Sequence, residues 1–264
     1  MEFKRVKMVY FSPTKTTKKV LKSIASGIGV EEIIDFDLTY PNDIEQATAS
    51  FCDELVIIGA PVYAGRLPVV AVERFKQLRA KNTLAIIVVV YGNRDYEDAL
   101  LELKNLVIES GFTPVAGGAF VAEHSYSTDD TPIAKGRPDS LDMQNAIKFA
   151  QKIRNKIKTL PTSQIDLKVS GNFPYKDAML PNTVAPVVDE KLCSQCGECI
   201  EVCPTGAIFL EDSIVTKTEL CVRCCACIRS CPSEARMVED IAWKSIGARL
   251  NANCSTRKEP ELFL

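Results

Sequence analysis

Apolar residues in the first 160 positions form short continuous runs that alternate with longer stretches carrying an amphipathic stripe. The runs at residues 55–58 and 84–90 are apolar throughout, as strands covered on both faces should be. Strands are predicted at residues 5–11, 33–38, 54–59, 83–91 and 114–121, and helices at residues 16–26, 69–80, 95–110 and 140–158. This alternation predicts an α/β fold with a doubly wound parallel sheet.

We expect the five strands to lie in the order 2-1-3-4-5, with helices on both faces of the sheet. Open sheets with this order bind ligands beyond the carboxyl ends of their strands, at the switch between the first and third strands. The loops that follow the first, third and fourth strands are therefore where functional residues are expected.

The loop after the first predicted strand runs Ser12-Pro13-Thr14-Lys15-Thr16-Thr17 and leads directly into an amphipathic helix. Its hydroxyl groups can hydrogen-bond a phosphate while the first N–H groups of the helix point at the same anion. Neither a Walker sequence nor G-x-G-x-x-G is present, which disfavours ATP or a dinucleotide here. A plain Ser/Thr helix cap is the alternative, but four hydroxyl residues in six positions favour a phosphate site.

The loop after the third predicted strand contains Pro61, Val62, Tyr63, Ala64 and Gly65. Small residues let the main chain approach a planar ring closely, and Tyr63 offers an aromatic face for stacking. A tight strand-to-helix turn would also explain Gly65, but it would not explain Tyr63 at the rim. The loop is therefore a candidate for contact with a flat ligand.

The first loop resembles the phosphate loop of flavodoxins, which runs Ser/Thr-x-Thr-Gly-Asn-Thr and cradles the FMN phosphate. Ser12, Thr14 and Thr17 match that pattern, whereas Lys15 and Thr16 replace its glycine and asparagine. Lys15 can compensate with a charge-assisted contact to the phosphate. The resemblance implies a flavodoxin-like fold that binds FMN, with the second loop facing the flavin ring.

A third loop follows the fourth predicted strand, where the pyrimidine edge of the flavin would lie. Its candidate binding residues are Tyr91, Gly92, Asn93, Arg94 and Tyr96. Arg94 near that edge could stabilise the anionic reduced ring. The sole histidine, His124, follows the last strand and is a weak catalytic candidate, because an isolated histidine is more often structural.

Eight of the eleven cysteines fall into two copies of one spacing. The runs are Cys193-x2-Cys196-x2-Cys199-x3-Cys203-Pro204 and Cys221-x2-Cys224-x2-Cys227-x3-Cys231-Pro232. Structural zinc sites usually separate their Cys-x2-Cys pairs by a dozen or more residues, whereas here a third cysteine follows after two. Disulfides are the other alternative, but the N-terminus shows no apolar signal segment that would indicate an oxidising compartment.

The spacing matches the bacterial [4Fe–4S] pattern, and residues 184–240 resemble two-cluster bacterial ferredoxins with all eight ligand cysteines in place. The two halves form an internal repeat offset by 28 residues. The resemblance implies two [4Fe–4S] clusters, in which the fourth cysteine of each run binds the other cluster. The implied ligand sets are Cys193, Cys196, Cys199 and Cys231 for one cluster, and Cys221, Cys224, Cys227 and Cys203 for the other. Cys52, Cys225 and Cys254 are expected not to be ligands.

Composition adds little to this picture. The chain has 264 residues, is 46% hydrophobic and has a net charge of −2, as expected for a soluble cytoplasmic protein of about two domains. The acidic balance argues against nucleic acid as a partner, and no apolar run is long enough to cross a bilayer.

We therefore expect a flavodoxin-like FMN domain at residues 1–160, a proline-containing connector at 161–183, and a small α+β ferredoxin domain at 184–240. A C-terminal helix and tail at 241–264 are expected to dock back onto the rest. The whole chain resembles flavodoxin-like and ferredoxin fusion proteins of anaerobes.

That resemblance implies electron transfer between FMN, the clusters and redox partner proteins such as a ferredoxin or a reductase. The alternative is an FMN-dependent oxidoreductase of a small molecule such as a quinone, a nitro compound or a nicotinamide. The sequence leaves open the direction of electron flow, the donor and acceptor, and the oligomeric state.

Overall fold

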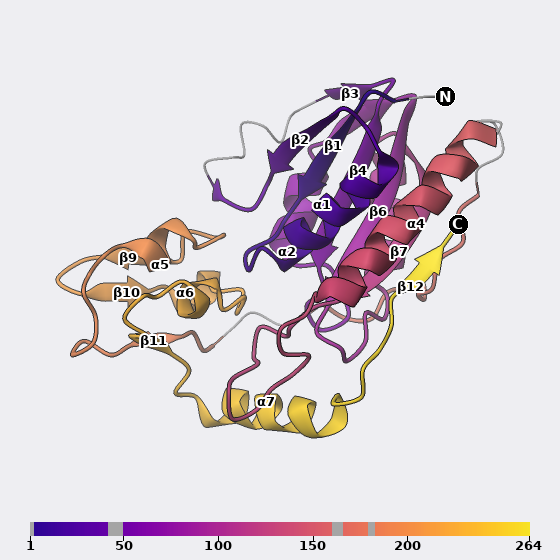
Figure 1. The fold of residues 1–264 in the computed structure, drawn as a ribbon. Coiled ribbons are helices and arrows are strands. Elements are labelled where there is room, and N and C mark those ends of the chain that lie inside the picture. Colours follow the sequence, from indigo (N-terminus) through magenta and orange to yellow (C-terminus); the bar gives the residue numbers. More distant parts are fainter. Residues whose placement is uncertain (1–2, 42–49, 160–165, 179–182) are drawn as a thin grey trace.

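The computed structural model describes residues 3–41, 50–159, 166–178 and 183–264. An α/β unit built around one twisted sheet lies beside a smaller cysteine-rich unit, and the C-terminal segment returns from the second unit to the first (Figure 1). The carboxyl ends of the parallel strands face the cysteine-rich unit, since the loops after β4 and β7 contact it.

The central sheet has the order β12-β7-β6-β4-β1-β2. Its parallel strands are β1 (Arg5–Tyr10), β2 (Glu32–Asp37), β4 (Leu55–Pro61), β6 (Thr83–Tyr91) and β7 (Phe112–Val121). Every residue of β6 is buried, because this strand lies inside the sheet with helices over both faces. The predicted order 2-1-3-4-5 is confirmed for these five strands.

The sheet has one strand more than the five parallel strands expected. Residues Glu261–Phe263 form β12, which pairs antiparallel with β7 and completes that edge of the sheet. A three-residue strand carries no readable period, and its pairing partner lies far away in the sequence, so the pattern of apolar residues does not reveal it.

Two helices cover each face of the sheet. α1 (Thr16–Ile28) and α4 (Ser140–Thr159) pack on one face, and α2 (Val69–Phe75) and α3 (Ala99–Glu109) pack on the other. The helix predicted at residues 69–80 is shorter than expected, because residues Arg79–Lys81 form strand β5 and pair with β3 (Ser50–Cys52). In the described segments no helix has the length and apolar character needed to cross a bilayer.

The cysteine-rich unit repeats one backbone pattern twice. Its first half holds α5 (Glu198–Glu201) and β9 (Ile208–Leu210), and its second half holds α6 (Ala226–Arg229) and β11 (Arg236–Met237), each 28 positions later. The unit is completed by β8 (Val187–Val188), β10 (Ile214–Thr216) and the short 3-10 helix η2 (Thr218–Leu220).

Left-handed backbone positions repeat with the same offset. Gln195 and Arg223 have φ of 53° and 52°, and Gly197 and Cys225 have φ of 81° and 61°. Cys225 thus occupies a turn position where the other half has glycine. This explains its place in the sequence without assigning it a ligand role.

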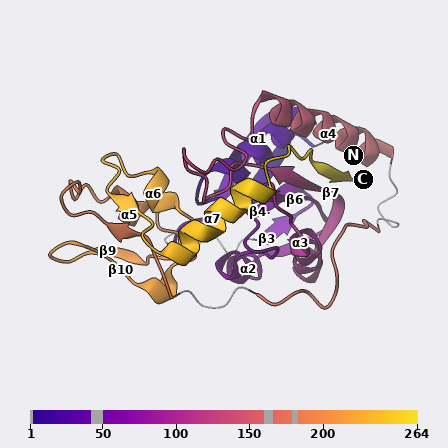
Figure 2. The ribbon, with the colours of Figure 1, turned by 90° about the horizontal axis from the view of Figure 1, so that it is seen from below.

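Helix α7 (Ile241–Asn253) runs between the cysteine-rich unit and the carboxyl edge of the sheet (Figure 2). Asp240 begins it by accepting a 2.6 Å hydrogen bond from the N–H of Trp243. Beyond the helix, the buried side chain of Asn93 donates to the carbonyls of Cys254 and Thr256 at 2.6 and 2.8 Å. The tail thus docks onto the loop that follows β6.

The described part of the connector, residues 166–178, packs along α3. Asp98 accepts hydrogen bonds from the N–H groups of Asn172 and Lys176, both at 2.8 Å. Asn105 donates to the Tyr175 hydroxyl at 2.7 Å. The rest of the expected connector, residues 161–165 and 179–182, lies outside the described residues.

Asp142 joins α4 to the C-terminal tail. It is 2% exposed, accepts from the guanidinium of Arg137 through both carboxylate oxygens, and accepts a third contact of 3.1 Å from Arg257. We expect D142A to lower the free energy of unfolding by about 3–5 kcal/mol, because it leaves the buried Arg137 unpaired. In the matched control D129A, which breaks only an exposed pair with Lys135, the change should stay within about 0.5 kcal/mol. Urea unfolding of the anaerobic protein measures both, and equal effects would contradict this role.

Candidate functional site

The loop after β1 folds as a compact turn at the N-terminus of α1. Lys15, which replaces the glycine of the flavodoxin pattern, adopts the left-handed backbone that glycine favours, with φ of 62°. Ser12 is buried and its hydroxyl accepts a 3.1 Å bond from the N–H of Lys18, so it caps the helix. The loop therefore keeps its turn despite the missing glycine.

The threonine hydroxyl groups of this loop can donate hydrogen bonds to a ligand. Thr14 and Thr16 share a 3.3 Å hydrogen bond, and both side chains are half-buried. Thr17 is 1% exposed, and its hydroxyl has no hydrogen-bond partner among the described residues. A buried hydroxyl without a partner is unfavourable, so a ligand oxygen at this loop would satisfy it. The 13-residue helix α1 presents its free N–H groups at the same place.

The loop after β4 turns tightly at Tyr63. Its N–H donates to Arg66 O at 2.9 Å, and the N–H of Arg66 donates back to Tyr63 O at 3.1 Å. Ala64 and Gly65, at the centre of the turn, have φ of 52° and 86°. Burial raises the pKa of Tyr63 well above its ordinary value, and the thiols of Cys224, Cys225 and Cys221 reinforce the shift.

The side chains of the loop after β6 lie in two different places. Arg94 faces a cleft, but Tyr91, Asn93 and Tyr96 do not line it. Tyr91 and Tyr96 are buried with ring centroids 5.5 Å apart, and the Tyr96 hydroxyl donates to Glu261 of the tail. In this structure Asn93 and Tyr96 bind the C-terminal tail, and Tyr91 packs against Tyr96, so these side chains are directed away from the cleft.

The cleft has a volume of about 340 Å³ and lies between the sheet loops and the cysteine-rich unit. Val62, Tyr63 and Ala64 form one wall, and His124, Ser125 and Tyr126 form another. The remaining lining residues are Arg94, Lys176, Val222, Arg223, Ile246, Arg249 and Leu250. The phosphate-loop residues 12–17 are not part of its lining.

Four of the lining residues are cations, and no Asp or Glu of the described residues lines the cleft. Arg94 pairs with Glu97 at 2.8 Å, and Lys176 pairs with the same carboxylate. Arg223 lies over the ring of Trp243, 5.7 Å from its centroid. Sequence reasoning missed Lys176, Arg223 and Arg249, because they come from three segments that only the folded chain brings together.

His124 is fixed as a neutral ring. Its Nδ1 accepts a 3.0 Å hydrogen bond from the N–H of Tyr126, which leaves Nε2 as the protonated nitrogen. Its ring packs against Gly92, where any Cβ would come within 2.2 Å of it. Burial, with Arg229 and Arg94 nearby, lowers the pKa of His124 from 6.5 to about 4. His124 is therefore a hydrogen-bond donor rather than an acid at neutral pH.

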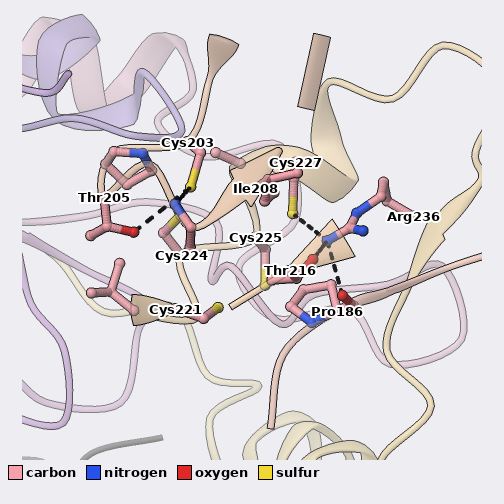
Figure 3. A pocket seen from close by; sticks show the side chains of 14 residues that line it. Pro186, Cys203, Thr205, Ile208, Thr216, Cys221, Cys224, Cys225, Cys227 and Arg236 are labelled. Atoms are coloured by element: carbon pink, nitrogen blue, oxygen red, sulfur yellow. Dashed lines mark hydrogen bonds between the residues drawn. The ribbon is translucent and has the colours of Figure 1, made fainter. Parts of the chain in front are cut away.

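One set of four thiols gathers in the pocket that faces the α/β unit. Cys203, Cys221, Cys224 and Cys227 line it together with the neighbouring Cys225, and Figure 3 shows the sulfurs of Cys203, Cys221 and Cys227 directed toward the space between them. We call these four residues the inner thiol set. Burial raises the pKa of Cys224 well above its ordinary value, and that of Cys227 to about 11.

The other four cysteines line a second pocket. Cys193, Cys196, Cys199 and Cys231 form this outer thiol set, and Cys196 is exposed. Burial also raises the pKa of Cys199. Burial opposes ionisation of Cys231 as well, but hydrogen bonds from Ser233 and nearby N–H groups hold its pKa below the ordinary value.

The structure brings together the same cysteines that the resemblance groups as ligands, including the exchanged Cys203 and Cys231. In the described segments no three Cys, His, Asp or Glu side chains are close enough to share a single ion. Each pocket is instead lined by the four cysteines of one set, and four is the number of thiolates that a [4Fe–4S] cluster takes. Cys52 and Cys254 line neither pocket.

Arg74 ties the inner thiol set to the sheet. It is 5% exposed and donates to the carbonyls of Leu38 and Thr39, both at 2.6 Å, and to Pro204 O at 2.7 Å. Because Pro204 follows Cys203 directly, this arginine fixes one thiol of the set relative to the loop after β2. That loop also supplies the Thr39 hydroxyl, which accepts a 2.8 Å bond from the N–H of Ser12.

Comparison with known families identifies the first cysteine run. Residues 186–209 match the family described as "4Fe-4S binding domain". No curated protein matches the chain significantly in sequence.

Solved structures resemble the α/β unit. A flavodoxin from Fusobacterium nucleatum bound to flavin mononucleotide is 13% identical, with a TM-score of 0.39, and the match covers 59% of this chain and 98% of that one. Flavodoxin 2 from Bacillus cereus is 15% identical, with a TM-score of 0.43, over 58% and 99% of the two chains. The rubredoxin oxygen:oxidoreductase of Desulfovibrio gigas is 16% identical, with a TM-score of 0.38, over 59% and 36%.

These likenesses are too distant to bear on function. The fold itself rests on the observed strand order and on the matched cysteine run. The chain thus joins a flavodoxin-like α/β unit to a 4Fe-4S binding domain.

The neutral state of His124 can be tested directly, since it is the only histidine in the chain. The C2 proton resonance of the oxidised protein should titrate with a midpoint near the pKa of about 4. Because this value lies below 6.5, His124 contributes stability above pH 6.5 that is lost as the pH falls toward 4. H124Q identifies the resonance by removing it. A midpoint near 6.5 would show that the ring is solvated and free to act as an acid at neutral pH.

Proposed function

We propose that this chain transfers electrons between FMN, held at the carboxyl edge of the sheet, and two [4Fe–4S] clusters, held by the inner and outer thiol sets. FMN exchanges one or two electrons whereas each cluster exchanges one, so the pair couples two-electron chemistry to one-electron carriers. External redox proteins are the partners that this arrangement suits.

The main observation behind the proposal is that the cleft and the inner thiol set border each other. Val222 and Arg223 line the cleft beside Tyr63, and in the chain they lie between Cys221 and Cys224 of the inner set. Burial raises the pKa of Tyr126 to about 12; Arg223 opposes this shift, and the neighbouring thiols of Cys225, Cys221 and Cys224 add to it. A ring in the cleft would therefore be a close neighbour of a cluster in the inner set.

The loop before α1 suits the phosphate of FMN. Thr17 has an unsatisfied buried hydroxyl, Thr14 and Thr16 supply further donors, and Lys15 is exposed at the helix N-terminus. Backbone N–H groups of the helix complete an anion site. In the cleft, Tyr63 offers a ring to stack, and Arg94 supplies positive charge that would stabilise a reduced, anionic flavin.

The two thiol sets suit clusters rather than free thiols. Burial raises the pKa of Cys199, Cys221, Cys224 and Cys227 above the ordinary thiol value, so these thiols stay protonated at neutral pH unless a cation is bound. A cluster supplies that positive charge and converts the thiols to ligating thiolates. The outer set, with Cys196 exposed, is the natural point of exchange with an external protein.

A small-molecule reductase is the second candidate, because four cations around the cleft suit an anionic substrate. However, about 340 Å³ lies at the lower end of the ~300–1,000 Å³ that ligand sites span. A cleft of this size leaves little room for a substrate beside a flavin ring, which favours the carrier. Stopped-flow mixing with nicotinamides and with small ferredoxins separates the two functions: rapid flavin reduction by a nicotinamide favours the reductase, and exchange only with proteins favours the carrier.

Metal and sulfide analysis tests the cluster assignment. Anaerobically purified protein should carry about eight irons and eight sulfides. C203S should lose the inner cluster and retain about four of each, because it removes one ligand of that set. C225S is the matched control, since Cys225 is also buried and lines the same pocket but is not assigned as a ligand. Stoichiometric zinc without sulfide, or equal iron loss in both variants, would contradict the assignment.

Flavin analysis tests the phosphate loop. T17V should reduce FMN occupancy at least several-fold at fixed added FMN while leaving iron content unchanged, because the phosphate loses a buried donor. T83V is the control: Thr83 is fully buried at the opposite end of the sheet and donates to Lys81 O. Unchanged FMN affinity in T17V would remove this loop from the site.

A further inference from the structure

Arg236 lies between the two thiol sets. It begins β11 and is the one charged residue of the described chain that lines both thiol pockets. It is 3% exposed, so its guanidinium is held away from water. Figure 3 shows the side chain reaching toward Cys227 across the inner pocket.

The guanidinium has neutral hydrogen-bond partners. It donates to Pro186 O and to the Thr216 hydroxyl, each at 2.9 Å, and reaches the sulfur of Cys227 at 3.9 Å. It forms no ion pair with a carboxylate, and its Nε has no partner, within the parts of the chain that the structure describes. A buried charge is costly unless an opposite charge compensates it, so this arginine requires anions that are not carboxylates.

The internal repeat marks the same residue. Counting 28 positions back from Arg236 gives Ile208, which follows Cys203, Pro204 and Ala207 just as Arg236 follows Cys231, Pro232 and Ala235. Ile208 is 4% exposed and lines the inner pocket as an ordinary apolar residue. One half of the repeat thus replaces an apolar core residue with a cation.

We propose that Arg236 is a built-in counter-charge for both clusters, which raises their reduction potentials and acts most strongly on the inner cluster. The proposal rests on the two-cluster content proposed above. Each one-electron reduction adds a negative charge to a cluster that thiolates already make anionic, and a fixed neighbouring cation stabilises the added charge. Net charge and hydrogen bonds to sulfur are established determinants of cluster potential. The reduction potential of the inner cluster is raised more. Among the described residues, the one cysteine sulfur within reach of the guanidinium is that of Cys227, which belongs to the inner set.

Potentiometric titration of the holoprotein, followed by EPR of the reduced clusters, tests this role. R236M and R236Q should lower the equilibrium constant for reducing the inner cluster at least tenfold, a shift of about 59 mV, and shift the outer cluster less. R236K keeps the charge and should stay closer to the wild-type protein than either neutral variant. I208M is the matched control at the equivalent repeat position. It should change the reduction potential of either cluster less than R236M and R236Q do.

The outcomes separate this proposal from the proposed function. Neutral variants with about eight irons that titrate at the wild-type potential, or an equal shift in I208M, would overturn the role of Arg236 while leaving two clusters in place. A wild-type protein without two reducible clusters would overturn the proposed function itself. If neither neutral variant assembles, hyperfine spectroscopy tests the placement instead. The protein is labelled with guanidino-15N arginine and carries R223K, which removes the arginine that lies between Cys221 and Cys224. In the reduced state it must show 15N hyperfine coupling to the inner cluster. Its absence would overturn the placement of Arg236.

Discussion

The packing of the inner thiol set against the carboxyl edge of the sheet is the contact on which the rest of the structure depends. Tyr63 and Tyr126 line the cleft between the sheet loops and the cysteine-rich unit, and Arg74 fixes the backbone after Cys203 to the loop after β2. Electron tunnelling falls steeply with distance, so two redox centres serve one pathway only if the protein holds them close. In the proposed function, this border would keep FMN in the cleft close to a cluster in the inner thiol set.

The C-terminal segment secures the border from the other side. α7 spans the two units, and Trp243 packs against Tyr126 with ring centroids 5.0 Å apart. Farther along, the tail binds Asn93, and β12 closes the edge of the sheet. The C-terminal segment thus holds the cysteine-rich unit at the cleft, adds Arg249 to its lining, and binds side chains of the loop after β6.

Much of this architecture is readable in the sequence, because its signals are local. The alternation of apolar runs with amphipathic stretches identifies the five parallel strands, and cysteine spacing indicates the two thiol sets. Positions that depend on distant contacts are not readable: β12 needs β7 as a partner, and residues 79–81 become a strand only beside β3. Three of the cations that line the cleft, Lys176, Arg223 and Arg249, come from separate segments. No local sequence pattern therefore predicts its positive charge.

Other features are visible in the sequence only once the structure gives them meaning. Lys15 breaks the flavodoxin pattern, yet it adopts the left-handed turn that the missing glycine would provide. Arg236 breaks the internal repeat at a buried position, where a cation is unexpected unless anions surround it. In both cases a departure from a pattern is informative because the backbone around it is preserved.

Rapid-freeze EPR after photoreduction of the flavin tests the central claim most directly. In anaerobic protein carrying FMN and both clusters, selective reduction of the flavin should be followed within one molecule by the signal of a reduced cluster, at a rate independent of protein concentration. C203S, which lacks a ligand of the inner set, should lose this fast phase. A transfer rate that rises with protein concentration, or that is unchanged in C203S, would contradict an electron path through the border between the cleft and the inner thiol set.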